Sequence, residues 1–256
     1  MKTVGIIPAR LQSTRLPRKL LLNVTGKPLI QYVWETACEC PEFHDVVIAT
    51  DSEEIARVVH SFGGRAEMTG QHNSGTDRIA EVTRRCFPDA DVIVNLQGDE
   101  PELDPQVVAS LVREMRSSGC QMATVAAPIT SAAVVRDPSC VKVVMDVNGR
   151  AMYFSRSPIP FSRDLAIEDH FRDGEPSPWL LHVGLYAFRR DFLLKLTTMP
   201  PSPLEQLEKL EQLRALQSGA SMAVAVVNHA AVGIDTPEDY AAFVARQSRP
   251  QIRRAA

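Results

Sequence analysis

The chain has 256 residues, of which 45% are hydrophobic, enough for one large domain with a well-buried core. Its 28 Lys and Arg residues against 31 Asp and Glu residues give a formal net charge of −3. This balance argues against non-specific nucleic-acid binding, which needs a basic face, and no apolar run approaches transmembrane length. We therefore expect neither a nucleic-acid nor a membrane partner.

The five cysteines are odd in number and scattered, and none has the spacing of a zinc site. Cys38 and Cys40 lie two apart on a predicted helix and would point to different faces. We predict reduced thiols in a cytoplasmic protein. The N-terminus enters a strand pattern almost at once, so we also expect no signal peptide before the fold.

The first predicted element is a strand at residues 4–7, apolar enough to be buried on both faces of a parallel sheet. Pro8 is expected to end its ladder because proline has no N–H to donate. The following loop carries four cations and no carboxylate: Arg10, Arg15, Arg18 and Lys19. Such a loop at the carboxyl end of a first strand predicts a polyphosphate site, since Arg and Lys suit phosphate oxygens. The alternative is a solvated basic loop, which Pro17 and the buried strand disfavour.

The next segments alternate between helix and strand. A helix begins at Pro28, and a strand at 45–50, a helix at 51–62 and a short strand at 65–68 follow. This order predicts a parallel sheet with right-handed crossovers. A polar loop at 70–78 then leads into another helix, where Ser74 and Thr76 could simply be capping residues.

The clearest strand, at residues 91–96, delivers Gln97-Gly98-Asp99-Glu100-Pro101 to the carboxyl edge of the sheet. Gly98 permits close approach of the backbone, and Pro101 prevents strand or helix from continuing. An acid presented there beside a triphosphate is a candidate magnesium ligand, because magnesium prefers hard oxygen donors shared with phosphates. The alternative for Asp99 is a turn aspartate that binds its own backbone.

After a helix from Pro105 and a strand at 122–127, the alternation changes. Apolar segments at 141–145 and 151–154 flank Asn148-Gly149, the strongest short signal of a β-hairpin. A proline-rich loop from 155 to 178 follows, and a loop of that length in a compact domain is usually functional or mobile.

The last third contains a strand at 179–188, an amphipathic helix at 203–214, a strand at 222–227 and a final helix. The strand places His182 and Tyr186 on one side, where a lone histidine is usually a core residue. Asp235 could simply introduce the final helix, with Thr236 as its cap and Pro237 at its first position.

Five motifs resemble the 3-deoxy-manno-octulosonate cytidylyltransferases, which activate the eight-carbon acidic sugar Kdo for bacterial lipopolysaccharide. Sialic-acid activating enzymes share a looser form of the first motif. The motifs are Ile-Pro-Ala-Arg-x-x-Ser-Thr-Arg-Leu-Pro-x-Lys at 7–19, Ser-Gly-Thr-x-Arg at 74–78, Val-Asn-x-Gln-Gly-Asp-Glu-Pro at 94–101, His-x-Gly-x-Tyr at 182–186 and Pro-Leu-Glu-x-x-Glu-x-Leu-Glu-Gln-Leu-Arg at 203–214.

The resemblance implies an α/β fold of the three-layer, Rossmann-like nucleotidyltransferase type. Its sheet would be mostly parallel, with an antiparallel hairpin excursion. Residues 1–246 would form a single domain, with the hairpin and loop excursion at about 138–190, and 247–256 would form a polar tail. A homodimer is implied as well.

The resemblance also implies the site. CTP would contact Pro8, Ala9, Arg10, Ser13, Arg15, Lys19, Ser74 and Arg78. The sugar would contact Gln97, Arg156, His182, Tyr186, Glu211 and Gln212, with the fork of Arg156 on its carboxylate. Asp99 and Asp235 would hold Mg²⁺, and with Lys19 they would form the catalytic set.

Two rival functions remain. One is the same reaction on another acid sugar, sialic acid or 8-amino-Kdo, because the loop from Arg156 to Pro178 departs most from the family pattern. The other is a catalytically silent nucleotide-binding regulator, which the joint presence of Lys19, Asp99 and Asp235 disfavours. A dinucleotide oxidoreductase and a P-loop kinase are excluded because neither G-x-G-x-x-G after the first strand nor G-x-x-x-x-G-K-[ST] is present.

Overall fold

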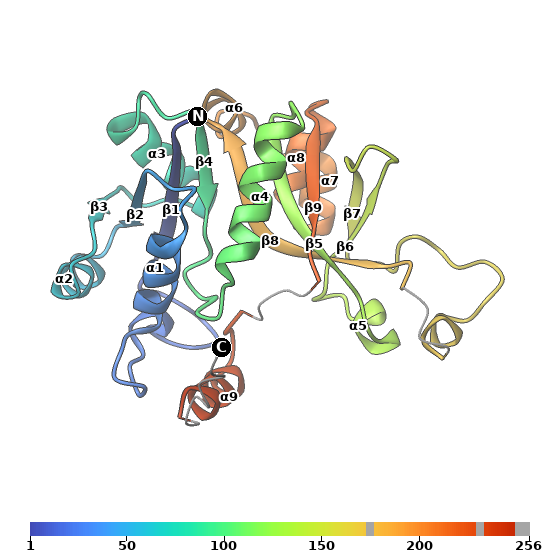
Figure 1. Ribbon diagram of the computed structural model, residues 1–256, viewed down its shortest axis with the longest axis horizontal. Helices are drawn as coiled ribbons and strands as arrows, with labels where there is room; N and C mark the ends of the chain where they lie inside the picture. Colours follow the sequence, from blue (N-terminus) through green and yellow to red (C-terminus); the bar gives the residue numbers. More distant parts are fainter. Residues whose placement is uncertain (173–176, 229–232, 249–256) are drawn as a thin grey trace, which may run out of the picture.

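The structure is a computed structural model, and it describes residues 1–172, 177–228 and 233–248. At its centre the described residues form a nine-stranded mixed sheet in the order β3-β2-β1-β4-β8-β5-β9, with β6 and β7 as a hairpin on β8 (Figure 1). The strands are β1 (Thr3–Ala9), β2 (Asp45–Thr50), β3 (Ala66–Met68), β4 (Val92–Asn95), β5 (Met122–Pro128), β6 (Lys142–Met145), β7 (Ala151–Ser155), β8 (Leu180–Arg189) and β9 (Met222–Val226).

Helices cover both faces of this sheet. They are α1 (Leu29–Glu39), α2 (Glu53–Ser61), α3 (Gly75–Cys86), α4 (Pro105–Ser117), α5 (Ala132–Arg136), α6 (Arg190–Leu196), α7 (Pro203–Glu208), α8 (Gln212–Gln217) and α9 (Pro237–Gln247), with 3₁₀ turns η1 (Lys19–Leu21) and η2 (Ile167–Phe171). One core packs α1, α2 and α4 against the sheet, and the other packs α3, α6 and α8. The three-layer α/β fold predicted from the sequence is therefore confirmed.

The two cores follow from alternation along the strands. In β1, Ile7 and Ala9 belong to the first core, and Val4 and Ile6 belong to the second. All four side chains are at most 1% exposed. A strand covered on both faces reads as a continuous apolar run, which is why the sequence identified it as a buried strand.

The prediction that Pro8 ends the first strand is wrong. Pro8 lies within β1 and pairs in register with Ala49 of β2. The Ile6 carbonyl points toward β4, where it accepts the Leu96 N–H. Because residues two apart in a strand face the same side, the Pro8 nitrogen also points toward β4. It needs no partner there, because the pairing of β1 with β4 ends at Ile6 and Asn95.

The sheet is parallel from β3 to β4, and β8 then runs antiparallel between β4 and β5. From the sequence, antiparallel pairing was expected only in a hairpin excursion, and no reversed strand was expected in the middle of the sheet. The hairpin of β6 and β7 is present, and the Asp146 carboxylate accepts the N–H groups of Asn148 and Arg150 at its turn, both at 2.8 Å.

The single helix predicted at 203–214 is in fact two helices, α7 and α8. Lys209 between them adopts a left-handed conformation with φ of 55°. In one straight helix Glu205 and Arg214 would lie about 13 Å apart along the axis, at 1.5 Å per residue. The break folds the chain back, so that Arg214 Nε donates to Glu205 Oε2 at 2.8 Å, while Leu210 and Leu213 enter the core.

Side-chain caps begin several helices. Ser52, Ser74, Asp104, Ser202 and Thr236 each accept an N–H of the first turn, and those of Ser74 and Thr236 were predicted from the sequence. Pro237 occupies the first position of α9, as predicted, whereas Pro28 occupies the N-cap position of α1 instead of its first position.

The C-terminal helix brings the end of the chain to its beginning. Phe243 of α9 is fully buried and packs edge-on against Tyr32 of α1, with ring centroids 5.2 Å apart. Leu16 of the basic loop and Ile234 belong to the same cluster. This contact carries Asp235 to the loop after β1.

The remaining predictions concern segments at the margins. The turn η2 lies within the long loop predicted at 155–178. Residues 173–176 of that loop lie outside the described residues, as does the predicted polar tail from residue 249 onward. The structure shows no disulfide among the five cysteines. None of the helices in the described part of the chain is long and apolar enough to span a bilayer.

Candidate active site

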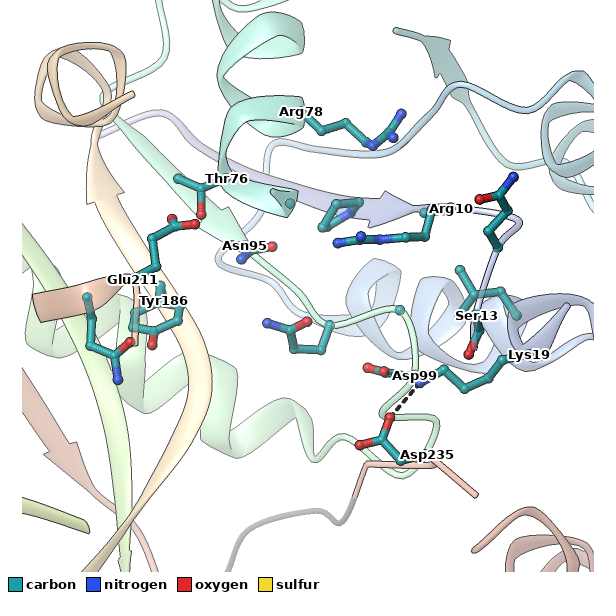
Figure 2. Close-up of a pocket in the computed structure, with 18 of the residues that line it drawn as sticks. Arg10, Ser13, Lys19, Thr76, Arg78, Asn95, Asp99, Tyr186, Glu211 and Asp235 are labelled. Carbon is teal, nitrogen blue, oxygen red and sulfur yellow. Dashed lines mark hydrogen bonds and ion pairs between the residues drawn. The ribbon is translucent and has the colours of Figure 1, made fainter. Parts of the chain in front are cut away.

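A cavity of about 560 Å³ lies at the carboxyl ends of β1 and β4 (Figure 2). The loops that follow these two strands form one wall, the start of α3 a second, and β8 with α8 a third. Most of the residues predicted from the sequence line it: Pro8, Ala9, Arg10, Ser13, Arg15, Lys19, Arg78, Gln97, Asp99, Tyr186, Glu211, Gln212 and Asp235.

The loop after β1 presents its cations to the cavity from a fixed base. Leu16 and Leu20 are buried, and Lys19 lies in the turn η1 with its side chain only 11% exposed. Arg10 lines the cavity and has no ion-pair partner among the described residues. Arg18, by contrast, adopts a left-handed conformation and pairs with Glu54.

Two carboxylates from distant segments converge on Lys19. Its Nζ lies 2.6 Å from Asp99 Oδ2 and 2.9 Å from Asp235 Oδ1. Arg15 adds a second cation, with Nη2 at 2.9 Å from Asp235 Oδ2. Burial alone would lower the pKa of Lys19, but Asp99 and Asp235 outweigh it and hold the pKa above its ordinary value.

Backbone contacts fix the two acid-bearing segments against each other. The Ile234 N–H donates to the carbonyl of Asp99 at 2.9 Å. Asp239 Oδ2 accepts the N–H groups of Asp235 and Thr236 at 3.0 and 2.9 Å. The cap of α9 and the position of Asp235 are therefore fixed by the same hydrogen bonds. A place for Asp235 at the start of the final helix is thus compatible with the predicted role in the cavity.

The opposite end of the cavity is polar, but its chemistry differs. Figure 2 shows Tyr186, Glu211 and Asn95 together, across the cavity from Lys19 and Asp99. Burial raises the pKa of the Glu211 carboxyl, and the nearby hydroxyl of Thr76 opposes this only in part. Burial also raises the pKa of Tyr186, with Glu211 as a second cause. Gln97 uses Nε2 to donate to the Gly184 carbonyl at 2.7 Å, which holds its side chain against β8.

Comparison with known proteins agrees with this geometry. Residues 4–224 match the profile of the cytidylyltransferase family. A 3-deoxy-manno-octulosonate cytidylyltransferase of Rhodopirellula baltica is 45% identical over 248 residues, covering 96% of this chain and 98% of that protein. The chain belongs to the 3-deoxy-manno-octulosonate cytidylyltransferase family.

Two further relatives of this cytidylyltransferase point the same way. A protein of the same name from Syntrophotalea carbinolica is 45% identical over 241 residues, covering 93% of this chain and 96% of that one. A solved CMP:2-keto-3-deoxy-manno-octonic acid synthetase complexed with CTP superposes with a TM-score of 0.88 at 42% identity, covering 96% of this chain and 98% of that chain. The fold of the cytidylyltransferase and its class of activity are thereby shown.

Three of the residues predicted for the site do not line the cavity. Ser74 accepts the Asp77 N–H at 3.0 Å as the cap of α3. His182 contacts Thr124 Oγ1 through Nε2 at 3.0 Å, and burial lowers its pKa to about 3. Arg156 donates from Nε to the Glu208 carbonyl, at 2.8 Å. Whether these three residues bind substrate stays a prediction.

Part of the cavity wall was not predicted from the sequence as site residues: Gln12, Thr14, Leu20, Gly75, Thr76, Asn95, Gly98, Met122, Phe188 and Leu196. The polar members lie within the quoted motifs and could have been found there. Met122 and Phe188 face each other across β5 and β8, and Leu196 comes from α6, so only the folded chain brings them together.

The cavity offers few ligands to a metal ion. Within the described ranges, no cluster of three or more His, Cys, Asp or Glu side chains could hold one. Asp99 and Asp235 are a pair of carboxylates, and the remaining ligands of an ion between them would have to be water or substrate oxygens.

Proposed function

We propose that this cytidylyltransferase transfers CMP from CTP to the anomeric hydroxyl of Kdo and releases pyrophosphate, with Mg²⁺ as its cofactor. The observation that carries the choice of substrates is identity of about 45% over nearly the whole chain with proteins named for this reaction. The relative solved with CTP supports the choice of nucleotide.

The phosphates of CTP belong at the cationic end of the cavity. Arg10, without an ion-pair partner among the described residues, presents a guanidinium whose fork fits two phosphate oxygens. Lys19 and Arg15 add charge beside it. Replacing Lys19 or Arg15 by Ala is expected to weaken CTP binding or turnover at least tenfold, given the strength of charge-assisted hydrogen bonds.

The carboxylates of Asp99 and Asp235 fit a magnesium ion. Both are hard oxygen donors, and both lie within hydrogen-bonding distance of the same ammonium nitrogen, so they face a common point. When bound there, Mg²⁺ would neutralise the charge of the triphosphate and polarise its oxygens. Two carboxylates suffice because CTP brings further oxygen ligands of its own.

The chain's own residues act mainly by positioning. Lys19, Arg10 and Arg15 hold the phosphates so that the α-phosphorus faces the centre of the cavity. Tyr186 on β8, and Gln97, whose side chain is held against β8, orient the sugar, whose anomeric hydroxyl attacks the α-phosphorus in line with the departing pyrophosphate. Orientation and preorganised charge then supply most of the rate enhancement.

The sugar carboxylate was assigned to Arg156 from the sequence, and the structure gives a reason to test that assignment. Arg156 Nη1 donates to the Pro138 carbonyl at 2.8 Å, in addition to the bond of Nε with the Glu208 carbonyl, so each edge of the guanidinium already has one nitrogen bound to the backbone. If Arg156 binds the carboxylate, Arg156→Ala should lose activity on Kdo far more than on a neutral analogue. Equal losses on both would make Arg156 structural.

Three further aspects are part of the proposal. The product would serve lipopolysaccharide synthesis, the chain would work as a homodimer, and the enzyme would be cytoplasmic. Activity on 8-amino-Kdo or sialic acid and a silent regulatory role are the alternatives that an assay must separate.

A pyrophosphate-release assay separates these functions. CTP, UTP, ATP and GTP would each be offered with Kdo, 8-amino-Kdo and sialic acid, with and without Mg²⁺. We expect release with CTP and Kdo when Mg²⁺ is present, and losses of several orders of magnitude in Asp99→Asn and Asp235→Asn. A higher kcat/KM for another sugar would reassign the substrate. No release with any pair would leave a nucleotide-binding regulator.

A further inference from the structure

Two amide side chains in the wall of the cavity are buried without a hydrogen-bond partner. Asn95, at the end of β4, and Gln212, at the start of α8, are each 5% exposed. Asn95 Oδ1 and Gln212 Nε2 are fully enclosed and make no hydrogen bond. Because no described residue contacts either amide by a hydrogen bond, the statement holds whichever way round each amide group lies.

Buried amides without partners are uncommon because burial removes their hydrogen bonds to water. Leaving such a group unsatisfied destabilises the folded state, whereas replacing it by an apolar group of similar shape can be neutral or stabilising. A folded chain that keeps two of them in one cavity wall has a reason outside its own stability. The simplest reason is a ligand that bonds to the half of each amide that is open to the cavity.

The surroundings define the chemistry of that ligand. Asn95 pairs with Tyr186 across β4 and β8, and Glu211 precedes Gln212. Figure 2 places Asn95, Tyr186 and Glu211 on the opposite side of the cavity from Lys19, Asp99 and Asp235. This end therefore offers amides, a phenol and a buried carboxyl, and the cations gather at the other end.

A hydroxyl group fits these atoms better than a charged group does. Each amide has one enclosed atom, so a ligand in the cavity reaches the other one, which is Nδ2 of Asn95 and Oε1 of Gln212. The first needs an acceptor and the second a donor, and a hydroxyl is both, also if either amide lies the other way round. An ammonium group has no lone pair to offer Asn95. A carboxylate could not donate to Gln212 and would lie beside the buried carboxyl of Glu211.

We propose that Asn95 binds a neutral hydroxyl of the acid sugar and, with Gln212, selects substrates that carry it. Gln212 was already assigned to the sugar from the family resemblance, and Asn95 is the new residue. The proposal rests on the proposed function, because it takes Kdo as the substrate. It also explains why an unpaired amide persists in a buried strand: substrate selection is gained at the expense of stability.

The first test is the variant Asn95→Leu, which keeps the branching at Cγ and removes both polar atoms. We expect its melting temperature without ligands to be equal to or above that of the wild type. The KM for Kdo should rise at least tenfold, whereas the KM for CTP should stay within about twofold, because removing one partner of a buried hydrogen bond costs binding selectively. An unchanged KM for Kdo would overturn the proposal.

A matched control removes a buried hydroxyl that does have a partner. Thr83 is fully buried in α3, outside the cavity, and its Oγ1 donates to the Ile79 carbonyl at 2.7 Å. Thr83→Val is isosteric and should not be stabilised, and its KM values for both substrates should match the wild type. A gain in stability confined to Asn95→Leu would then reflect the loss of an unpaired amide, not added apolar bulk.

A second test identifies the contact even where Asn95→Leu proves less stable. Wild type and variant would be assayed with Kdo and with analogues that each lack one hydroxyl. For one analogue the wild type should lose at least tenfold in kcat/KM, and Asn95→Leu should show almost no further loss. Equal losses in both enzymes for every analogue would refute the role of Asn95.

Failure of the proposed function and failure of the Asn95 contact give different results. If the wild-type enzyme does not turn over Kdo with CTP, the proposed function is refuted. If it does, and Asn95→Leu behaves as the wild type with every analogue, only the role of Asn95 is refuted.

Discussion

The contact of Lys19 with two carboxylates predicts a measurable exchange between the lysine and a divalent ion. In Lys19→Met the apolar stem remains, but Asp99 and Asp235 lose the ammonium that lies 2.6 and 2.9 Å from them. The folded chain would then hold two acids that face one point with only Arg15 nearby. We expect this variant to be less stable in EDTA and to gain more than the wild type from Mg²⁺.

The size of the effect follows from exposure. The side chains of Lys19 and Asp99 are 11% and 30% exposed, so their charge-assisted bond should contribute about 1.5–3 kcal/mol. Asp235 is 45% exposed, and screening reduces its pair with Lys19 to about 0.5 kcal/mol. A loss of about 2–3.5 kcal/mol corresponds to a fall in Tm of about 4–14 °C for a chain of this length.

Differential scanning calorimetry in EDTA and in millimolar Mg²⁺ measures both effects. Calorimetric titration of Mg²⁺ into each protein without nucleotide should show tighter binding to Lys19→Met, because the ion no longer competes with an ammonium. Lys2→Met is a suitable control, since its pair with Asp89 is equally short, at 2.7 Å, but the side chains are 39% and 68% exposed. The control should melt within about 2 °C of the wild type.

Two results would refute this reasoning. One is a Lys19→Met protein that melts like the control in EDTA. The other is a Mg²⁺ affinity that is unchanged or weaker than in the wild type, which would mean that the two carboxylates do not form a site for a cation.

Three other predictions concern residues around the site. Burial would raise the pKa of Glu205, but Arg214 outweighs it and the pKa is lowered, so Glu205→Gln should lower Tm by about 2–6 °C at pH 7. This difference should begin to shrink as the pH falls below about 4.5 and be lost as the pH falls through the lowered pKa of Glu205. Because burial lowers the pKa of His182 to about 3, the wild type should lose stability as the pH falls below about 6.5, and His182→Gln should lose less in acid melts. Asp239→Ala, which removes the acceptor for the Asp235 N–H, should raise the Mg²⁺ concentration needed for half-maximal turnover several-fold more than it changes the KM for CTP.

Much of the fold was predictable because its signals are local. The buried runs of β2 and β4 appear in the sequence as continuous apolar segments, and Ser74 and Thr236 appear as caps before helices. The loop from Gln97 to Asp99 was found for the same reason, since a strand before it and Pro101 after it fix its place. Each of these features depends on residues within one or two turns of chain.

The features that the sequence did not predict depend on distant partners. Nothing near β8 indicates that it runs antiparallel between β4 and β5, because its direction is set by pairing with Asn95 and Thr124. The break at Lys209 lacks the glycine that usually marks a left-handed residue, and it is explained by the pair of Glu205 and Arg214 across it.

The site shows the same division. Lys19 and Asp99 were predicted from charge and strand order, and the structure brings them into contact. Asn95 was overlooked because an asparagine at the end of a strand has many ordinary roles. Its significance depends on burial without a partner, which only the folded chain reveals.

Transfer of CMP to the sugar can be followed directly by ³¹P NMR of the purified protein with CTP, Kdo and Mg²⁺. The three resonances of CTP should decay together while one phosphodiester resonance and pyrophosphate appear in equal amounts. Neither product should form without Kdo, or with Asp99→Asn at the same protein concentration. Formation of CMP and pyrophosphate with no sugar-linked phosphodiester, or no decay of CTP at all, would rule out this transfer.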